Sequence, residues 1–215
     1  MTGKSQILSV AEIPWKQFAK KNNLTGKQFE QFQCYYSLLI KANELFNITA
    51  ITDLESVLAY HFEDSLILGK KIDLTAINSI ADVGTGGGFP GIPLKIMYPH
   101  LNVTLIEVTQ KKVAFLNDVI ETLGLTGIKT CDLDWRTFLR KSTEPIDLFC
   151  ARASLQPDEL LRIFAQGGRY EKSVFVYWAS HEWQPNAKQE YYLKKCYSYA
   201  VGDRQRNYCI FSAQR

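Results

Sequence analysis

The sequence feature that most constrains the fold is the stretch from Asn78 to Leu94, which reads N-S-I-A-D-V-G-T-G-G-G-F-P-G-I-P-L. Its first half is a short apolar run that ends in clustered glycine, at Gly84, Gly86, Gly87, Gly88 and Gly91. This pattern predicts a buried strand followed by a tight turn, because glycine adopts positive φ without steric strain. Pro90 and Pro93 suit the first turn of a helix. The stretch therefore predicts a ligand site between a strand and the N-terminus of a helix.

The spacing of the glycines distinguishes among possible ligands. A dinucleotide-binding fingerprint starting at Gly84 requires a third glycine at position 89, where this chain has Phe89. A phosphate-binding loop requires Lys and then Ser or Thr after Gly91, where the chain continues with Ile-Pro. The remaining pattern, Asp82-x-Gly84-x-Gly86-x-Gly88, resembles that of S-adenosyl-L-methionine (AdoMet) methyltransferases, whose loop surrounds the methionine end of the cofactor. A glycine-rich surface turn is the alternative.

From Ile80 onward, short apolar runs alternate with helical periodicity. We predict strands at Ile80–Val83, Val103–Ile106, Ile128–Cys131, Ile146–Cys150, Val174–Trp178, Cys196–Val201 and Tyr208–Ser212. Helices are predicted at Ile92–Met97, Lys111–Leu123, Arg136–Lys141 and Leu155–Ala165. This alternation indicates an α/β fold with a mostly parallel seven-stranded sheet covered on both faces. The last two strands have no helical spacer, so we expect them to form a hairpin.

The first third of the chain is predicted to be helical. Apolar residues recur at three- and four-residue steps from Gln28 to Phe46, and Asp53 is the expected N-cap of a second helix. His61 and Asp64 are predicted near the polar side of this second helix. Either His61 bonds a neighbouring backbone group and fixes helix packing, or the helix forms one wall of a substrate cleft. We therefore expect an N-terminal helical region, residues 1–75, packed on an AdoMet-binding methyltransferase domain, residues 76–215.

Composition argues against several classes of protein. No run of about 18 uncharged apolar residues is present, so we expect no transmembrane helix. The segment 1–10 lacks the apolar stretch of a signal peptide, which favours a cytoplasmic protein. The five cysteines form no CxxC pair and none stands at metal-ligand spacing from a histidine, so we expect reduced thiols and no metal site. No long exposed heptad is present, and we expect a monomer.

The net charge of +3 is concentrated at the N-terminus. Residues 1–28 have a charge of +4. They contain one glutamate, Glu12, and five lysines, Lys4, Lys16, Lys20, Lys21 and Lys27. A basic arm of this kind either follows a phosphate backbone or forms a solvated helix face. The charge alone does not decide between the two.

Candidate cofactor contacts follow the second and third predicted strands. Glu107 ends the second strand, where a carboxylate can accept hydrogen bonds from both hydroxyls of a ribose. The alternative for Glu107 is an ion pair with a nearby surface lysine. Asp132 and Asp134 follow the third strand, where either could meet an adenine edge or cap a helix. Trp135 offers a flat surface for an adenine ring, although core packing is the more frequent role of tryptophan.

Arg152 follows the fourth predicted strand. A charge directly after an apolar run is normally exposed or paired, and ligands of such sheets bind beyond the carboxyl ends of the strands. Arg152 is therefore the candidate catalytic residue, with its guanidinium available to an RNA phosphate or a guanine edge. The alternative is a salt bridge to an acidic neighbour.

From about Tyr36 to Phe211 the chain resembles the bacterial small-subunit rRNA guanine-N7 methyltransferases, also called glucose-inhibited division protein B. The matching motifs are Asn47-Ile48-Thr49-Ala50-Ile51, His61 with Asp64-Ser65-Leu66, Asp82 to Leu94, Glu107 with Lys111-Lys112, Arg152-Ala153 and Arg206. The Pro-Gly-Ile-Pro extension and the Asp-Ser-Leu triplet are the most specific of these, since all methyltransferases of this fold share the glycines.

The resemblance implies a Rossmann-like methyltransferase fold and AdoMet-dependent methylation of guanine N7 at nucleotide 527 of 16S rRNA. The implied acceptor is 16S rRNA or a small-subunit assembly intermediate. The residues expected to bind the cofactor are Asp82, Gly84, Thr85, Gly86, Gly88, Phe89, Pro90, Glu107, Asp134, Trp135 and Arg152. The residues expected to bind the substrate are His61, Asp64 and Arg206.

Two positions depart from the family pattern. The family's Arg-x-Glu pair after the third strand is replaced by Asp134-Trp135-Arg136, and its Lys-Gly after the fifth strand by Trp178-Ala179-Ser180-His181. These departures leave two alternatives open: an AdoMet-fold binding module of reduced activity, or a methyltransferase acting on another RNA or a small molecule. Guanine N7 carries a lone pair and no proton, so the expected reaction requires no general base. Carbon-5 methylation would require a cysteine nucleophile, and Cys150 lies inside a predicted strand.

Overall fold

The computed structural model describes residues 12–214. Lys4 of the predicted basic arm and the segment 1–10 lie outside the described residues. The chain begins with helices α1 (Glu12–Lys21) and α2 (Gly26–Leu45). The second helical stretch is irregular and consists of α3 (Leu54–Val57), the π-helix η1 (Leu58–Glu63), α4 (Asp64–Leu66) and the 3-10 turns η2 (Ile67–Lys70) and η3 (Leu74–Ala76).

Side-chain caps fix where these helices begin. A capping box starts α2, in which Thr25 and Gln28 each accept a hydrogen bond from the other's backbone N–H. The Asp53 carboxylate accepts a 2.9 Å hydrogen bond from Ser56 N, so the predicted N-cap of the second helical stretch is confirmed. These caps satisfy backbone donors that the first turn of a helix leaves unpaired.

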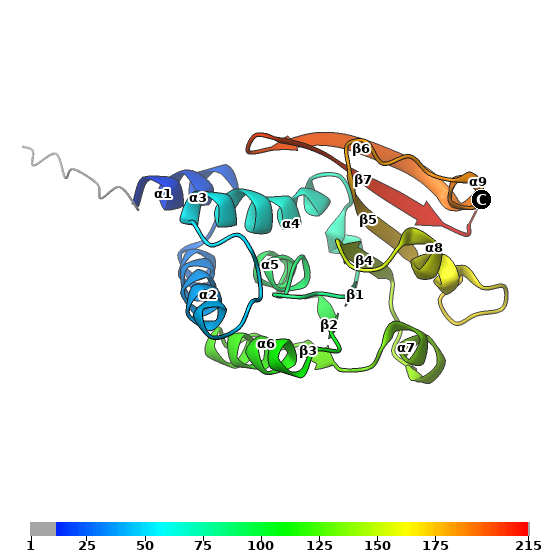
Figure 1. The fold of residues 1–215 in the computed structure, drawn as a ribbon, viewed down its shortest axis with the longest axis horizontal. Coiled ribbons are helices and arrows are strands. Elements are labelled where there is room, and N and C mark those ends of the chain that lie inside the picture. Colours follow the sequence, from blue (N-terminus) through cyan, green and yellow to red (C-terminus); the bar gives the residue numbers. More distant parts are fainter. Residues whose placement is uncertain (1–11, 215) are drawn as a thin grey trace, which may run out of the picture.

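One sheet of seven strands organises the rest of the chain (Figure 1). The strands are β1 (Ser79–Val83), β2 (Asn102–Ile106), β3 (Ile128–Cys131), β4 (Leu148–Arg152), β5 (Val174–Ser180), β6 (Leu193–Val201) and β7 (Arg204–Ser212), in the spatial order β3-β2-β1-β4-β5-β7-β6. Strands β1 to β5 are parallel, and β7 is antiparallel to both β5 and β6. The predicted mostly parallel sheet and its final hairpin are confirmed. The strand order reverses between β1 and β4, which is where ligands bind in such sheets.

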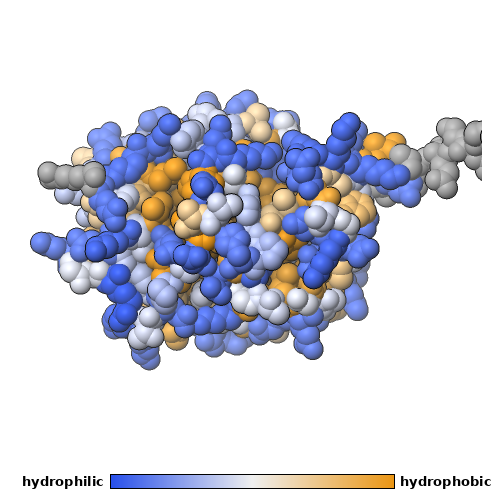
Figure 2. Space-filling view, turned by 180° about the vertical axis from the view of Figure 1, so that it is seen from behind, coloured by the Kyte–Doolittle hydropathy of each residue, from blue (hydrophilic) through white to orange (hydrophobic). Residues whose placement is uncertain are grey.

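Helices cover both faces of this sheet. They are α5 (Gly91–Met97), α6 (Gln110–Thr122), α7 (Trp135–Lys141), α8 (Pro157–Leu160), the 3-10 turn η4 (Leu161–Phe164) and α9 (Ala187–Tyr192). In Figure 1, α2, α5 and α6 lie on one side of the strands and α7 and α8 on the other. Apolar side chains accordingly form two clusters, and β4 alternates between them: Leu148 and Cys150 belong to the first and Phe149 to the second. From behind, apolar residues form patches within a mostly hydrophilic surface (Figure 2).

The first cluster joins the N-terminal helices to the sheet. It contains Phe32 of α2 and Phe62 of η1 together with Ile92 of α5 and Val103 of β2. No helix within residues 12–214 combines the length and the apolar character needed to cross a membrane. In the same part of the chain, no three His, Cys, Asp or Glu side chains gather as a metal ion would require.

Some predicted helix boundaries are wrong. The helix predicted at Leu155–Ala165 is split into α8 and η4, with Pro157 at the start of α8. Helix α9 was not predicted, although a capping box formed by Asn186 and Gln189 marks its start. Helical periodicity cannot be detected reliably in an element of six residues, because it completes fewer than two turns.

The expectation that all five cysteines are reduced is wrong for two of them. Cys196 and Cys209 form a disulfide and are directly paired in the register of β6 and β7, with their Cα atoms 4.1 Å apart. A separation of 13 residues does not by itself predict a disulfide, because the pairing of the two cysteines follows only from the register of the hairpin. Cys34, Cys131 and Cys150 are free thiols.

Candidate functional site

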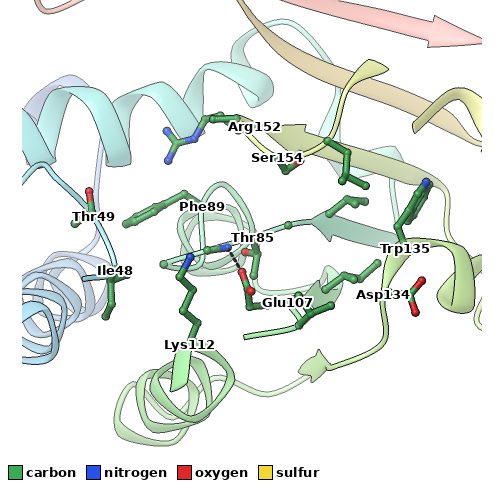
Figure 3. Close-up of a pocket in the computed structure, with 18 of the residues that line it drawn as sticks. Ile48, Thr49, Thr85, Phe89, Glu107, Lys112, Asp134, Trp135, Arg152 and Ser154 are labelled. Carbon is green, nitrogen blue, oxygen red and sulfur yellow. Dashed lines mark hydrogen bonds between the residues drawn. The ribbon is translucent and has the colours of Figure 1, made fainter. Parts of the chain in front are cut away.

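A cavity of about 550 Å³ lies at the carboxyl ends of β1, β2 and β4 (Figure 3). In this view Arg152 and Phe89 lie on one side, Glu107 and Lys112 on another, and Trp135 on a third. The lining comes from the loop after α2, from η1, from the glycine turn and from the loops that follow β2, β3 and β4. Its volume is in the range of small-molecule sites, and its position is the switch point of the sheet.

The glycine turn between β1 and α5 forms one wall of this cavity. Gly84, Gly86 and Gly88 have φ values of 67°, 59° and 99°, which only glycine adopts without strain. A Cβ added at Gly86 would meet nothing within 4 Å, so its backbone borders open space. Tyr35 of α2 holds the turn from the other side by donating a 2.5 Å hydrogen bond to Gly87 O. The predicted strand, turn and helix are thus confirmed as local structure.

Asp82 supports the turn from beneath and does not line the cavity. Its Oδ2 accepts hydrogen bonds from Thr85 Oγ1 at 2.6 Å and from Gly91 N at 2.8 Å. Complete burial raises the pKa of Asp82 to about 6, and these two hydrogen bonds oppose the rise. Gly88 and Pro90 are likewise outside the lining. The structure therefore places these three expected cofactor residues where they shape the turn, and Gly84, Thr85, Gly86 and Phe89 where they border the cavity.

Glu107 follows β2 and lies directly beside the glycine turn (Figure 3). Its Oε2 accepts a hydrogen bond from Gly86 N at 3.1 Å, and its Oε1 accepts one from Thr109 N at 2.9 Å. Within residues 12–214, Glu107 forms no ion pair with Lys111 or Lys112. Each carboxylate oxygen can accept a second hydrogen bond. Glu107 can therefore fix the turn and still accept hydroxyl donors from a ligand.

Asp134 and Trp135 border the cavity on the side of β3, whereas Asp132 does not. Asp134 is the N-cap of α7 and accepts a 3.0 Å hydrogen bond from Thr137 N; hydrogen bonds from Thr137 lower the pKa of Asp134. Trp135 is only 5% exposed, stacks on Phe138 and donates from Nε1 to a backbone oxygen at 3.0 Å. Both residues thus have structural roles, as the alternatives anticipated, and both also border the cavity.

Arg152 borders the opposite side of the cavity and is held by a buried acidic partner. Its Nη1 lies 2.9 Å from Asp64 Oδ2 and also donates to Tyr60 O at 2.9 Å. The same Asp64 oxygen lies 3.3 Å from Arg206 Nη1, and Asp64 Oδ1 accepts a 2.5 Å hydrogen bond from Tyr199. The salt-bridge alternative is therefore present, and Arg152 still faces the cavity (Figure 3).

The placement of His61 and Asp64 near a polar helix side is wrong. Asp64 is completely buried and His61 is 8% exposed, because β6 and β7 cover the helical stretch that carries them. The Asp64 carboxylate faces two arginines and a tyrosine, and neither Asp64 nor Arg206 lines the cavity. Of the three expected substrate residues, only His61 borders it.

His61 connects the N-terminal helices to the glycine turn. Its ring stacks on Phe89, with centroids 4.4 Å apart and an angle of 11° between the planes. Its Nε2 lies 2.8 Å from Thr49 Oγ1, and its Nδ1 lies 3.3 Å from Arg152 Nη2. Burial, with the adjacent Arg152 charge, lowers the pKa of His61 to about 3, so the ring is neutral at neutral pH. A neutral Nδ1 can then accept from the guanidinium.

Several lining residues were not among the predicted site residues. Ile48 and Thr49 come from the Asn-Ile-Thr-Ala motif, and Lys112 comes from the lysine pair after Glu107. Both motifs were part of the family resemblance, which was the available signal. Tyr199, which bonds Asp64 across 135 residues of sequence, had no signal in the sequence.

Comparison with protein families gives one match over most of the chain. The family model described as rRNA small subunit methyltransferase G matches residues 28–204. A protein named ribosomal RNA small subunit methyltransferase G from Halalkalibacterium halodurans is 44% identical over 133 residues, which cover 61% of this chain and 56% of that protein. A protein of the same name from Exiguobacterium sibiricum is 48% identical over 105 residues, which cover 49% of this chain and 44% of that protein. The chain spans about half the length of the curated relatives it matches.

Solved structures show the same fold at low sequence identity. The human methyltransferase 10 domain containing protein aligns with a TM-score of 0.60 at 13% identity, covering 85% of this chain and 97% of that one. TrmK from M. capricolum, solved with S-adenosylhomocysteine, aligns with a TM-score of 0.54 at 18% identity. The alignment covers 71% of this chain and 68% of that one. The predicted Rossmann-like methyltransferase fold is therefore confirmed.

Proposed function

Because the chain belongs to the rRNA small subunit methyltransferase G family, we propose that it transfers a methyl group from AdoMet to N7 of a guanine in 16S rRNA, at nucleotide 527. The observation that carries this proposal is the cavity at the switch point of the sheet, which is bordered by the glycine turn, Glu107 and Arg152. The cavity therefore combines a backbone turn, a carboxylate that accepts hydrogen bonds and a guanidinium that donates them, and it suits a ligand that carries both donors and acceptors.

The residues around the cavity fit AdoMet. Three alternate positions, Gly84, Gly86 and Gly88, have positive φ, and the open space beside Gly86 lets a methionine end approach the backbone closely. Glu107 has acceptor capacity left for the ribose hydroxyls. Trp135 supplies a flat surface and Asp134 a polar group at the side of the cavity where an adenine would lie.

Arg152 and His61 would hold the acceptor. Both border the cavity, with Arg152 on the side opposite Glu107 (Figure 3) and His61 Nδ1 3.3 Å from Arg152 Nη2. The Arg152 guanidinium can donate to a guanine edge or a phosphate oxygen. Asp64 keeps Arg152 in this place through its 2.9 Å contact. We assign Asp64 and Arg206 to positioning, because Asp64 is completely buried and neither residue borders the cavity.

The proposed reaction depends on the relative orientation of cofactor and guanine and needs no proton transfer before methyl transfer. When bound, AdoMet supplies a methyl group activated by its sulfonium. Guanine N7 attacks through a lone pair, so no side chain has to remove a proton first. The protein would act by holding both reactants in line, an effect that reaches roughly 7–11 kcal/mol in well-oriented systems. Cys150 is buried outside the cavity lining, and burial raises the pKa of its thiol, so it does not suit covalent catalysis.

A second candidate is a protein that binds AdoMet and RNA without turnover. It is favoured by Arg136, which departs from the family pattern and pairs with Glu159 at 2.7 Å instead of bordering the cavity. We propose the cytoplasm as the site of action and a monomer as the active form, with 16S rRNA or a small-subunit assembly intermediate as acceptor.

Two measurements separate these candidates. Titration calorimetry with AdoMet tests the cofactor, and transfer of tritiated methyl groups to 16S rRNA, 30S subunits and small metabolites identifies the acceptor. Binding with transfer to rRNA supports the proposed function. Binding without transfer to any acceptor supports the second candidate, and absence of AdoMet binding refutes both.

A further inference from the structure

Three exposed cations outside the cavity lie on tyrosine rings at the β6–β7 hairpin. We call this group the hairpin strip and define it as Tyr60, Lys71, Lys195, Tyr197 and Arg204. Within residues 12–214, none of its three cations forms an ion pair with an acidic side chain. The three cations are exposed, and the two tyrosines are partly buried. The strip therefore presents three exposed cations that form no ion pair in the described part of the chain, although Asp203 lies next to Arg204.

The tyrosines hold the cations in place. Lys195 Nζ lies 4.6 Å and Lys71 Nζ lies 5.6 Å from the centre of the Tyr197 ring. The guanidinium carbon of Arg204 lies 3.9 Å from the centre of the Tyr60 ring. Cations over aromatic faces are attracted by the ring, which restricts their motion before any partner binds. A guanidinium stacked in this way keeps its N–H edge free for a phosphate.

One end of the strip, formed by Tyr60 and Arg204, adjoins the residues that hold Arg152 at the cavity. Tyr60 directly precedes His61 in η1, and its backbone oxygen accepts a 2.9 Å hydrogen bond from Arg152. Arg206, two residues after Arg204, lies 3.3 Å from the same Asp64 oxygen that holds Arg152. Figure 1 shows the hairpin extending over the helical stretch that contains η1. A chain bound along the strip would therefore pass the side of the cavity formed by Arg152 and His61.

We propose that the hairpin strip binds the phosphate backbone of the RNA whose base enters the cavity. This inference rests on the proposed function and names the surface that it would use. Phosphates bind exposed cations, which the strip supplies in Lys71, Lys195 and Arg204; the Asp203 carboxylate, next to Arg204, accepts a hydrogen bond from Tyr60. An anionic membrane would also require exposed apolar side chains. Among the described residues, the large exposed ones are Ile13, Leu45, Val108, Leu155 and Tyr191, and none belongs to the strip.

The test compares two double variants with equal loss of charge. Lys71→Ala with Lys195→Ala removes two cations of the strip. The matched control, Lys141→Ala with Lys188→Ala, removes two exposed cations from α7 and α9, which lie on the other face of the sheet. Binding of a 16S rRNA transcript is measured by fluorescence anisotropy at several salt concentrations. AdoMet binding is measured by calorimetry on the same samples.

The strip variant should bind the transcript roughly 25- to 60-fold more weakly at about 0.1 M salt, because each phosphate contact changes the affinity about 5- to 8-fold there. Its salt slope should fall by about 1.4 to 1.8, the control should match the wild type, and AdoMet affinity should not change. Equal behaviour of the two double variants, or a wild type that binds no transcript, overturns the inference.

Vesicles of phosphatidylglycerol serve as the competing probe. Loss of vesicle binding in the strip variant with unchanged RNA binding would assign the strip to a membrane and overturn the RNA assignment. A wild type that binds the transcript through the strip but transfers no methyl group would refute the proposed function and leave the strip assignment standing.

Discussion

Replacing Asp64 with asparagine should destabilise the protein far more than removing an exposed acid. Asp64 is completely buried and faces Arg152 and Arg206, whose side chains are 9% and 20% exposed. Asparagine keeps the size of the side chain but removes the negative charge, which leaves two nearby guanidinium groups without a counter-charge. Breaking a buried ion pair costs about 3–5 kcal/mol in unfolding free energy. We expect about 3 kcal/mol, because Arg206 is partly exposed and can turn toward water.

The matched control is Glu144→Gln. Glu144 pairs with Lys129 at 2.7 Å, and the two side chains are 49% and 55% exposed. Exposed pairs contribute about 0–1 kcal/mol. Urea unfolding followed by circular dichroism would measure both variants, and the denaturant slope m should be unchanged in each. In thermal unfolding the Asp64 variant should lose about 6–12 °C, since a chain of this size loses about 2–4 °C per kcal/mol.

A double-variant comparison identifies the cause of the loss. Arg152→Met should lower the unfolding free energy less in the Asp64→Asn background than in the wild type. In that background the Asp64 carboxylate, which Arg152→Met would otherwise leave without a partner, is already absent. Equal losses for Asp64→Asn and Glu144→Gln would refute the claim that Asp64 is the counter-charge of the cavity arginine. Full additivity of the Asp64 and Arg152 changes would refute it as well.

Three further predictions concern the cavity. Gly86→Asp should abolish AdoMet binding in calorimetry, whereas Gly124→Asp, at a similar φ of 60° and also in open space, should retain it; loss of binding in both would point to backbone strain instead. Glu107→Gln should weaken AdoMet binding by about 10- to 150-fold, as expected for a lost charged acceptor worth about 1.5–3 kcal/mol, while the exposed Glu121→Gln should have no effect. His61 has a pKa of about 3 when folded and 6.5 as its ordinary value, so the unfolded chain binds more protons between these values and stability falls as pH falls. Between pH 6.5 and pH 5, the unfolding free energy of His61→Gln should therefore fall by about 1.6 kcal/mol less than that of the wild type in urea unfolding, and parallel pH curves would contradict this.

The centre of the sheet could be predicted from the sequence because β1, β2, β4 and β5 are mostly apolar runs bounded by turn residues. The glycines of the turn after β1 are local signals, since their positive φ values are properties of single residues. Glu107 and Arg152 could be placed at the cavity because Glu107 directly follows β2 and Arg152 is the last residue of β4, and the carboxyl ends of parallel strands share one edge of the sheet. These predictions depended on spacing of a few residues.

The network behind Arg152 could not be predicted in the same way. The contact between Asp64 and Tyr199 joins residues 135 positions apart, and the pairing of Cys196 with Cys209 depends on the register of a hairpin. The π-helix η1 also changes the direction in which His61 points, which a regular helical period does not anticipate. Long-range contacts and backbone irregularities therefore account for the errors in the N-terminal region and at the cysteines.

The proposed function places AdoMet in the cavity beside a guanine of 16S rRNA. The most direct measurement is mapping of N7-methylguanine, by borohydride and aniline cleavage followed by primer extension, in unmethylated 16S rRNA incubated with the protein and AdoMet. We expect one cleavage site, at nucleotide 527, which disappears in the Gly86→Asp variant and persists in Gly124→Asp. Cleavage at no site, or at a site unaffected by the change at Gly86, would contradict the proposed function.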